Sequence, residues 1–195
     1  MRIIAGRARG LHLKAPKGLE TRPTAARVRE AVFSILNARL GGFDGLEVLD
    51  AFAGSGANGL EAWSRGAARV TFIDHGRAPL ACIAANIEAA KAGAASCLHR
   101  KRLPRALADV PTGPYDLVFL DPPYKEHALL EETLAALVAH QRLKPGAVLV
   151  VEHTVHFTPQ LAEGLVSLDS RRYSETQITL VGFGERGEPD EAAAE

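Results

Sequence analysis

Four consecutive residues, Asp121-Pro122-Pro123-Tyr124, have the residue types best suited to chemistry in this chain of 195 residues. They follow residues 115–120, a run that is apolar except for Asp116 and is typical of a buried strand. The prolines fix φ and lack a backbone N–H, which leaves the Asp121 carboxylate and the Pro122 carbonyl as acceptors beside the Tyr124 ring. Two acceptors can hold both N–H bonds of an exocyclic base amine while the ring stacks on the base. The tetrad therefore predicts a site that activates a base amine, and a proline-rich turn without chemistry is the alternative.

A glycine-rich loop is the second candidate for chemistry. Residues 54–59, Gly-Ser-Gly-Ala-Asn-Gly, match G-x-G-x-x-G directly after a predicted strand. Glycines let the backbone turn tightly and let a ligand approach it closely. The acid at the end of the next predicted strand, Asp74, can accept hydrogen bonds from both ribose hydroxyls of an adenosine. The glycine pattern alone fits NAD as well as S-adenosylmethionine, and a packing turn of an α/β protein is the alternative.

Taken together, the two motifs resemble those of S-adenosylmethionine-dependent methyltransferases. The sequence around the loop, D-x-F-x-G-x-G, is similar to the first motif of the class I enzymes, in which the acid lies near the methionine end of the cofactor. The tetrad resembles the [D/N/S]-P-P-[Y/F/W] motif of enzymes that methylate amino nitrogens. The resemblance implies S-adenosylmethionine as cofactor, held by Asp50, Phe52, Gly54, Gly56 and Asp74, and catalysis by Asp121, Pro122 and Tyr124.

The rhythm of the chain predicts the elements that position these motifs. Strands alternate with helices from residue 46 onward, which favours a mostly parallel sheet covered on both faces. We expect an α/β, Rossmann-like class I methyltransferase fold that ends in an antiparallel hairpin. The predicted strands cover 47–52, 69–73, 98–103, 116–120 and 147–152; the helices cover 25–39, 59–65, a segment with Pro79 in its first position, and 128–140; the hairpin covers 165–173 and 176–183.

Charge divides the chain more sharply than its formal net charge of zero suggests. Residues 1–30 contain eight Lys and Arg against two Glu, whereas the last eleven residues contain five acids against one Arg. A second basic cluster lies at 100–105. Basic clusters attract phosphate backbones, although a solvated surface is the alternative for any one of them. We expect a basic arm and helix that contact RNA at 1–40, a methyltransferase domain at 41–184 and a disordered acidic tail at 185–195.

The N-terminal segment extends the resemblance to one family. RIIAG, RPT and RVRE, together with FAGSGANGLEAWSRGA and LDPPY, resemble the RsmD-type methyltransferases, bacterial enzymes that methylate N2 of one guanine in 16S rRNA. The resemblance runs from residue 1 to about 183. It implies 16S rRNA, within the small ribosomal subunit or its assembly intermediate, as the partner. It also implies RNA contacts by Arg7, Arg22, Arg27 and Arg29, and for Arg29 a solvated helix face is the alternative.

Other patterns narrow the class of protein. No apolar run approaches the roughly 20 residues that span a bilayer, and no signal peptide is evident, so we expect a cytoplasmic protein, and a monomer. The two cysteines are interpreted as reduced thiols, and no metal site is predicted. His153 and His156 are interpreted as polar residues of the surface or of a loop, and Trp63 is interpreted as part of the core. A DNA adenine-N6 methyltransferase and a non-catalytic RNA-binding assembly factor are the alternative functions.

Overall fold

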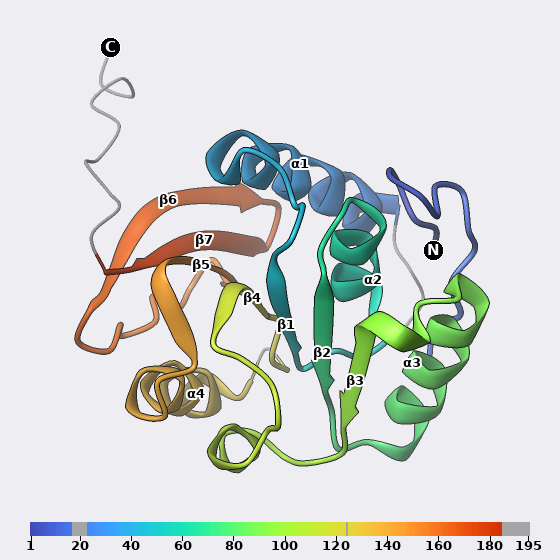
Figure 1. Cartoon of the computed structure of the whole chain (residues 1–195). Coiled ribbons are helices and arrows are strands. Elements are labelled where there is room, and N and C mark those ends of the chain that lie inside the picture. The colour runs from blue at the N-terminus through green and yellow to red at the C-terminus, as the bar shows by residue number, and fades with distance from the viewer. Residues whose placement is uncertain (17–22, 124, 185–195) are drawn as a thin grey trace.

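The structure, a computed structural model, describes residues 1–16, 23–123 and 125–184. Within these ranges seven strands form one sheet in the order β3-β2-β1-β4-β5-β7-β6 (Figure 1). The predicted roles of Arg22, of Tyr124 and of the acidic tail at 185–195 lie outside the described residues.

Strands β1 to β5 run parallel to one another, and β7, which lies between β5 and β6, runs against both of its neighbours. Neighbours among β1 to β5 pair in parallel, whereas β7 pairs antiparallel with both β5 and β6. The predicted mostly parallel sheet with a terminal antiparallel hairpin is therefore confirmed. The strands are β1 Glu47–Ala51, β2 Arg69–Ile73, β3 Ser96–His99, β4 Tyr115–Leu120, β5 Leu143–Thr154, β6 Leu165–Tyr173 and β7 Thr176–Phe183.

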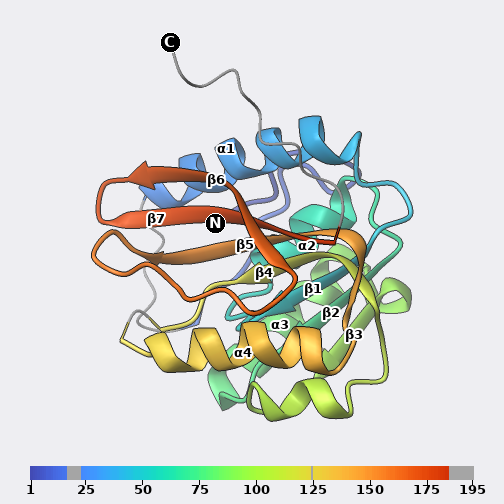
Figure 2. The same cartoon turned by 90° about the vertical axis from the view of Figure 1, so that its left-hand side faces the viewer.

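Helices cover both faces of the sheet, as Figure 2 shows with α1 on one side and α4 on the other. Apolar residues of α1, α2 and α3 pack into one hydrophobic cluster, and those of α4 pack into a second cluster on the opposite face. Two such clusters need strands that are apolar on both faces. The helices are α1 Pro23–Leu40, α2 Ala57–Ser64, α3 Arg77–Ala90 and α4 His127–Ala139, with short 3-10 helices at Gly93–Ala95 and Arg105–Ala108.

Strand β4 shows how the continuous apolar run arises. Leu117 and Phe119 pack into the cluster with α1, α2 and α3, whereas Val118 and Leu120 pack into the cluster with α4. Successive side chains of a strand point to opposite faces, so a strand buried on both sides is apolar at almost every position. The exception in β4 is the half-buried Asp116, which accepts the Glu47 N–H and pairs with Lys144. The same alternation determines which face of the sheet the side chain of Asp121, the residue after β4, points to.

Most predicted elements are confirmed, and the differences are local. The hairpin strands and β2 have the predicted bounds. The third strand is wrongly predicted at 98–103, because β3 ends at His99 and the basic cluster lies in the loop that follows. Helix α3 begins at Arg77, so Pro79 occupies its third position and not its first. Within residues 1–16, an isolated antiparallel bridge joins Arg2 to His12.

Candidate active site

The glycine loop joins β1 to α2 in a conformation that its sequence permits. Gly54 and Gly56 have φ of 56° and 76°, in the left-handed region that glycine adopts without strain. Phe52 is held at φ 62°, where a bulky residue is strained. A Cβ on Gly59 would lie 2.5 Å from the Phe72 ring, so this third glycine lets α2 pack closely on β2. A Cβ on Gly54 would meet only the Phe52 carbonyl, at 3.9 Å, so the loop is open to a ligand there.

Asp50 lies buried beneath this loop. Its Oδ2 accepts the Gly59 backbone N–H at 2.9 Å, which ties the end of β1 to the first turn of α2. The pKa of Asp50 is raised to about 7, because burial and, to a smaller extent, the nearby Asp74 carboxylate together outweigh the opposing effect of the Gly59 N–H. Asp50 therefore supports the loop and also contributes a poorly stabilised negative charge to the site.

Asp74 closes the same loop from the end of β2. Its Oδ2 accepts the Gly54 N–H at 3.0 Å, and its Oδ1 accepts the Gly76 N–H at 2.8 Å. An ionised carboxylate has about four lone-pair sites, so two remain for a ligand. The side chain is half-buried, which leaves it accessible to the hydroxyls of a sugar.

The described part of the tetrad lies beside this loop. Strand β4 is the direct neighbour of β1, so Asp121 follows β4 at the same carboxyl edge at which the loop follows β1. Ligands of open α/β sheets bind at this edge. Asp121 is open to solvent on one side, whereas Pro122 is buried. The rest of the protein surrounds Asp121 closely enough that desolvation raises its pKa well above the usual value, and the carboxylates of Glu152 and Asp50 raise it further.

The site therefore collects negative charge without balancing it. Within the described residues, no basic side chain forms an ion pair with Asp50, Asp74 or Asp121. Crowded carboxylates with raised pKa values bind a cation or a set of N–H donors favourably, because either ligand stabilises the ionised forms. The arrangement suits a ligand that carries positive charge next to an amine.

The predicted RNA-binding arginines have different surroundings. The Arg7 guanidinium stacks 5.0 Å from the centroid of the Trp63 ring, which is buried as predicted. Arg27 is exposed on α1. Arg29 is turned toward the N-terminal arm, by which we mean residues 1–16, and donates to the Arg2 carbonyl at 2.9 Å. Burial lowers the pKa of Arg29, and the Glu61 carboxylate opposes this effect. Their contacts with RNA stay predictions.

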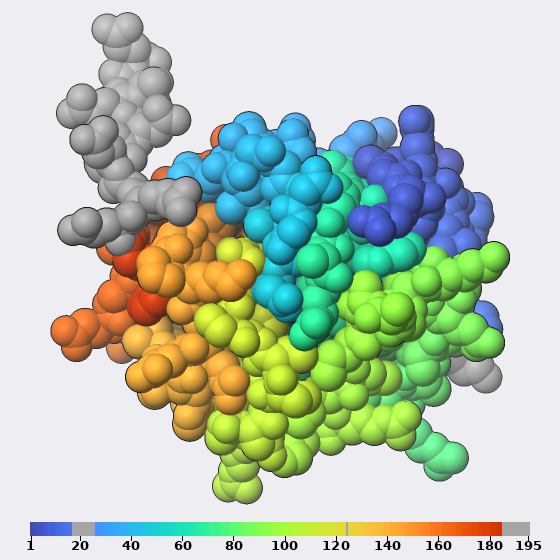
Figure 3. Space-filling model, viewed as in Figure 1, coloured from blue at the N-terminus to red at the C-terminus, as the bar shows by residue number. Residues whose placement is uncertain are grey.

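Polar contacts fasten the N-terminal arm to α2 and α3, against which it lies in the space-filling view (Figure 3). The buried carboxylate of Glu61 in α2 accepts the Ile4 N–H at 2.7 Å and the Ala5 N–H at 3.1 Å, and it pairs with Arg65 at 2.7 Å. The backbone N–H of Arg7 donates to the Ser64 carbonyl at 2.8 Å. The arm is thus a packed part of the domain.

Asn86 of α3, which the sequence did not single out, joins the arm to the glycine loop. Its side chain accepts the Lys14 N–H at 2.8 Å and donates to the Lys14 carbonyl at 3.0 Å. The same amide nitrogen donates to the Ser55 carbonyl at 2.9 Å. An amide is the short side chain that can accept one hydrogen bond and donate two at the same time. An Asn among the apolar positions of a predicted helix is the signal in the sequence that could have identified this residue.

His153 is a second correction. It is only 6% exposed, and its Nε2 lies 2.9 Å from the Thr179 hydroxyl, so the interpretation as surface polarity is wrong. It faces Phe157 edge-on, and Phe157 stacks on His127 at 3.8 Å between ring centroids. A shallow recess opens here, lined by Pro122, Pro123, Glu126, His127, Leu130, Glu152, His153, Thr154 and Phe157.

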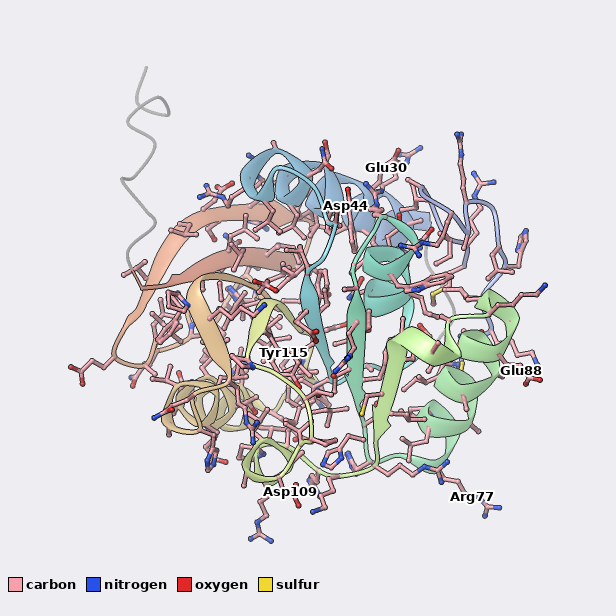
Figure 4. All side chains as sticks on the ribbon, viewed as in Figure 1. Glu30, Asp44, Arg77, Glu88, Asp109 and Tyr115 are labelled. Carbon is pink, nitrogen blue, oxygen red and sulfur yellow. The ribbon has the colours of Figure 1, made fainter. Side chains whose placement is uncertain are left out.

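The second basic cluster lies in the loop after β3, at the same edge of the sheet as the site. Arg100 and Arg102 are exposed, and Lys101 pairs with Asp109, which Figure 4 places at the border of the molecule. Both cysteines are free thiols. Among the described residues no cluster could hold a metal ion, and no helix is long and apolar enough to cross a membrane.

The sequence model of the family described as "Conserved hypothetical protein 95" matches residues 1–182. This match covers the N-terminal arm, the glycine loop, the tetrad and the terminal hairpin. The chain belongs to this family. The resemblance to the RsmD-type methyltransferases is confirmed by the relatives that follow.

Curated relatives of the family cover most of the chain. It is 40% identical over 155 residues to "Ribosomal RNA small subunit methyltransferase D" of Escherichia coli, and the match covers 80% of this chain and 75% of that protein. It is 34% identical over 184 residues to "Putative rRNA methyltransferase YlbH" of Bacillus subtilis, with 92% of this chain and 97% of that protein covered.

A solved structure shows the same fold. The structure titled "Putative methyltransferase yhhF from Escherichia coli" superposes with a TM-score of 0.83 at 32% identity, and the match covers 95% of this chain and 99% of that one. The predicted Rossmann-like methyltransferase fold is therefore confirmed.

Proposed function

We propose that this protein transfers a methyl group from S-adenosylmethionine to the exocyclic N2 amine of one guanine in 16S ribosomal RNA. One observation carries the proposal: Asp121 and Pro122 follow β4 directly beside the glycine loop that follows β1. Acceptors for an amine and a loop suited to a nucleoside thus share one edge of the sheet. Membership in a family whose relatives are named as ribosomal RNA methyltransferases supports the choice of RNA.

The residues present fit S-adenosylmethionine. Asp74 would hold the ribose hydroxyls with its remaining lone pairs, and the open side of Gly54 would lie along the cofactor, whereas Gly56 packs against Phe72 and Ile83 and would support the loop. Asp50, whose pKa is raised, would face the positively charged methionine end. No pyrophosphate has to be accommodated, and the acidic character of this edge opposes one, which favours S-adenosylmethionine over NAD.

The cofactor supplies the chemistry of the step, an electrophilic methyl group on a sulfonium. The protein orients the amine: the Asp121 carboxylate and the Pro122 carbonyl accept its two N–H bonds and direct the nitrogen lone pair toward the methyl group. As positive charge develops on the nitrogen, the same acceptors stabilise it. Tyr124, whose placement is not described, would stack on the base in this proposal.

The basic N-terminal arm and α1 would bind the RNA. We propose that residues 1–40 contact RNA through Arg7, Arg22, Arg27 and Arg29, and that the substrate lies within the small ribosomal subunit or its assembly intermediate. The backbone contacts position the RNA without reading its sequence. In the same proposal the protein works as a cytoplasmic monomer.

The decisive experiment is mass spectrometry of digested ribosomal RNA from cells with and without this protein. We expect one N2-methylguanosine of the small-subunit RNA to disappear without the protein and to return with the wild-type gene, but not with Asp121→Asn. Unchanged RNA together with lost N6-methyladenine in DNA would replace the proposal by the DNA alternative. Unchanged nucleic acids and no binding of S-adenosylmethionine would favour an assembly factor.

A further inference from the structure

A second carboxylate stands beside Asp121 at the edge of the sheet. Strands β4 and β5 pair in parallel register up to Leu120 and Val151, and the residues that follow these two are Asp121 and Glu152. Neighbouring strands are about 4.8 Å apart. Glu152 is held in place from its other side, because it pairs in register with Ile178 of β7.

The two carboxylates share one face of the sheet. Phe119 and Val150 both pack into the cluster with α1, α2 and α3, and the residues two positions further along each strand are Asp121 and Glu152. Because side chains alternate along a strand, both carboxylates point to that same face. Val48 of β1 packs into this cluster too, which places Asp50 on the same face. The electrostatic effect of Glu152 on Asp121 agrees with this closeness.

Guanine offers a pattern of donors that fits two neighbouring carboxylates. Its N1–H and its N2 amine are adjacent on the Watson–Crick edge, and both groups donate hydrogen bonds outward from the base. Adenine presents an amine beside an N1 acceptor, and a carboxylate opposite that acceptor would repel it. A pair of acceptors at this spacing therefore binds guanine and rejects adenine, since a site built to accept a hydrogen bond strongly disfavours a base that cannot donate one.

We propose that Glu152 is a specificity-determining residue, which accepts the N1–H of the target guanine while Asp121 and the Pro122 carbonyl accept its N2 amine. This inference rests on the proposed function and adds to it the group that selects the base. It also explains why a second acid is tolerated next to Asp121: the donors of the base stabilise both ionised carboxylates once it is bound.

The test is an exchange of base preference. The substrates are small-subunit particles assembled from ligated RNA that carries either guanine or 2-aminopurine at the methylated position. 2-Aminopurine keeps the N2 amine but has an acceptor at N1. Glu152→Gln can donate to that acceptor. We expect Glu152→Gln to lose about tenfold in kcat/KM on guanine and to gain on 2-aminopurine, so that the ratio of the two changes by at least about a hundredfold.

The matched control is Glu88→Gln, the same chemical change on α3, where Figure 4 shows Glu88 pointing away from the sheet. It should leave both rates unchanged. Binding of S-adenosylhomocysteine and the melting temperature show whether Glu152→Gln is folded. If it is not, Glu152→Ala, which has no acceptor and should lose the preference for guanine, replaces it.

Two results would overturn the inference, and they are distinguishable from failure of the proposed function. An unchanged preference for guanine in a folded Glu152→Gln variant, or in the Glu152→Ala variant, assigns base selection elsewhere. A wild-type protein that methylates neither particle removes the proposed function itself.

Discussion

Two regions of this protein place carboxylates in opposite surroundings. Where the N-terminal arm docks, Glu61 is fully buried and accepts two backbone N–H groups as well as the Arg65 guanidinium. At the carboxyl edge of the sheet, Asp121 has other carboxylates as its charged neighbours, and its pKa is raised. A buried charge with its partners in place stabilises a fold, whereas a crowded charge without a cation is suited to binding a ligand.

Asp121→Asn tests the ligand side of this contrast and should have the largest effect. The neutral amide stabilises the positive charge that develops on the amine less well than the carboxylate does. The rate of methyl transfer should therefore fall at least about a hundredfold, which corresponds to a loss of about 3 kcal/mol of transition-state stabilisation. The melting temperature at pH 7 should rise, because a carboxylate beside Glu152 and Asp50 has been removed. Labelled methyl transfer and thermal unfolding measure the two effects. A variant that is inactive because it is less stable would contradict the contrast.

Gly6→Ala tests the docking side. Gly6 has φ 82°, and a Cβ there would lie 1.9 Å from the Ser64 carbonyl oxygen. Gly10 has φ 85° and open space around it, so Gly10→Ala introduces the same backbone strain without the clash. We expect Gly6→Ala to lower the free energy of unfolding by about 1–3 kcal/mol more than Gly10→Ala. Denaturant unfolding of both variants gives this difference, and equal losses would mean that the arm is not tightly docked.

Asn86→Asp tests whether the two regions are connected. The new oxygen would face the carbonyls of Lys14 and Ser55, which the Asn86 amide now donates to. We expect binding of S-adenosylhomocysteine to weaken about tenfold, because the Ser55 carbonyl loses its buried donor. Titration calorimetry measures the affinity. Cys82→Ala is the control, because the Cys82 thiol contacts the Lys14 carbonyl at 3.2 Å and should loosen the arm alone. Equal affinities of the two variants for S-adenosylhomocysteine would show that Asn86 does not couple the arm to the glycine loop.

The pH dependence of stability should show a smaller effect. The pKa of Asp50 is about 7 in the folded protein against its ordinary value of 3.8, so the folded state binds more protons between these two values. The free energy of unfolding should therefore fall as pH rises from about 4 to about 7. Asp50→Asn can still accept the Gly59 N–H and should flatten this dependence. Melting temperatures of both proteins across that range provide the test, and parallel curves would place the raised pKa in doubt.

Local patterns identified the parts of the site that depend on backbone geometry. Glycine permits unusual φ angles and close packing, and proline fixes φ, wherever these residues occur. The spacing of the glycines at 54, 56 and 59 and of the two prolines, each next to a predicted strand, was therefore sufficient to locate the two motifs of the site. Asp74 was identified because the end of the second strand lies next to a glycine loop that follows the first strand. The same local rules failed for the strand at 98–103, since a run of mixed residues does not reveal where pairing with β2 stops.

The sequence by itself determined the reaction class, the order of strands and helices, and the residues that begin the site, because each of these depends on neighbours along the chain. Only the tertiary structure decided that Arg29 turns toward the arm, that His153 is buried, that Asn86 joins the arm to the loop, and that Glu152 stands beside Asp121. These placements depend on the register between strands and on packing between segments that are distant in sequence. No periodicity or motif records them, because the physical contact that defines them forms only when the sheet is assembled.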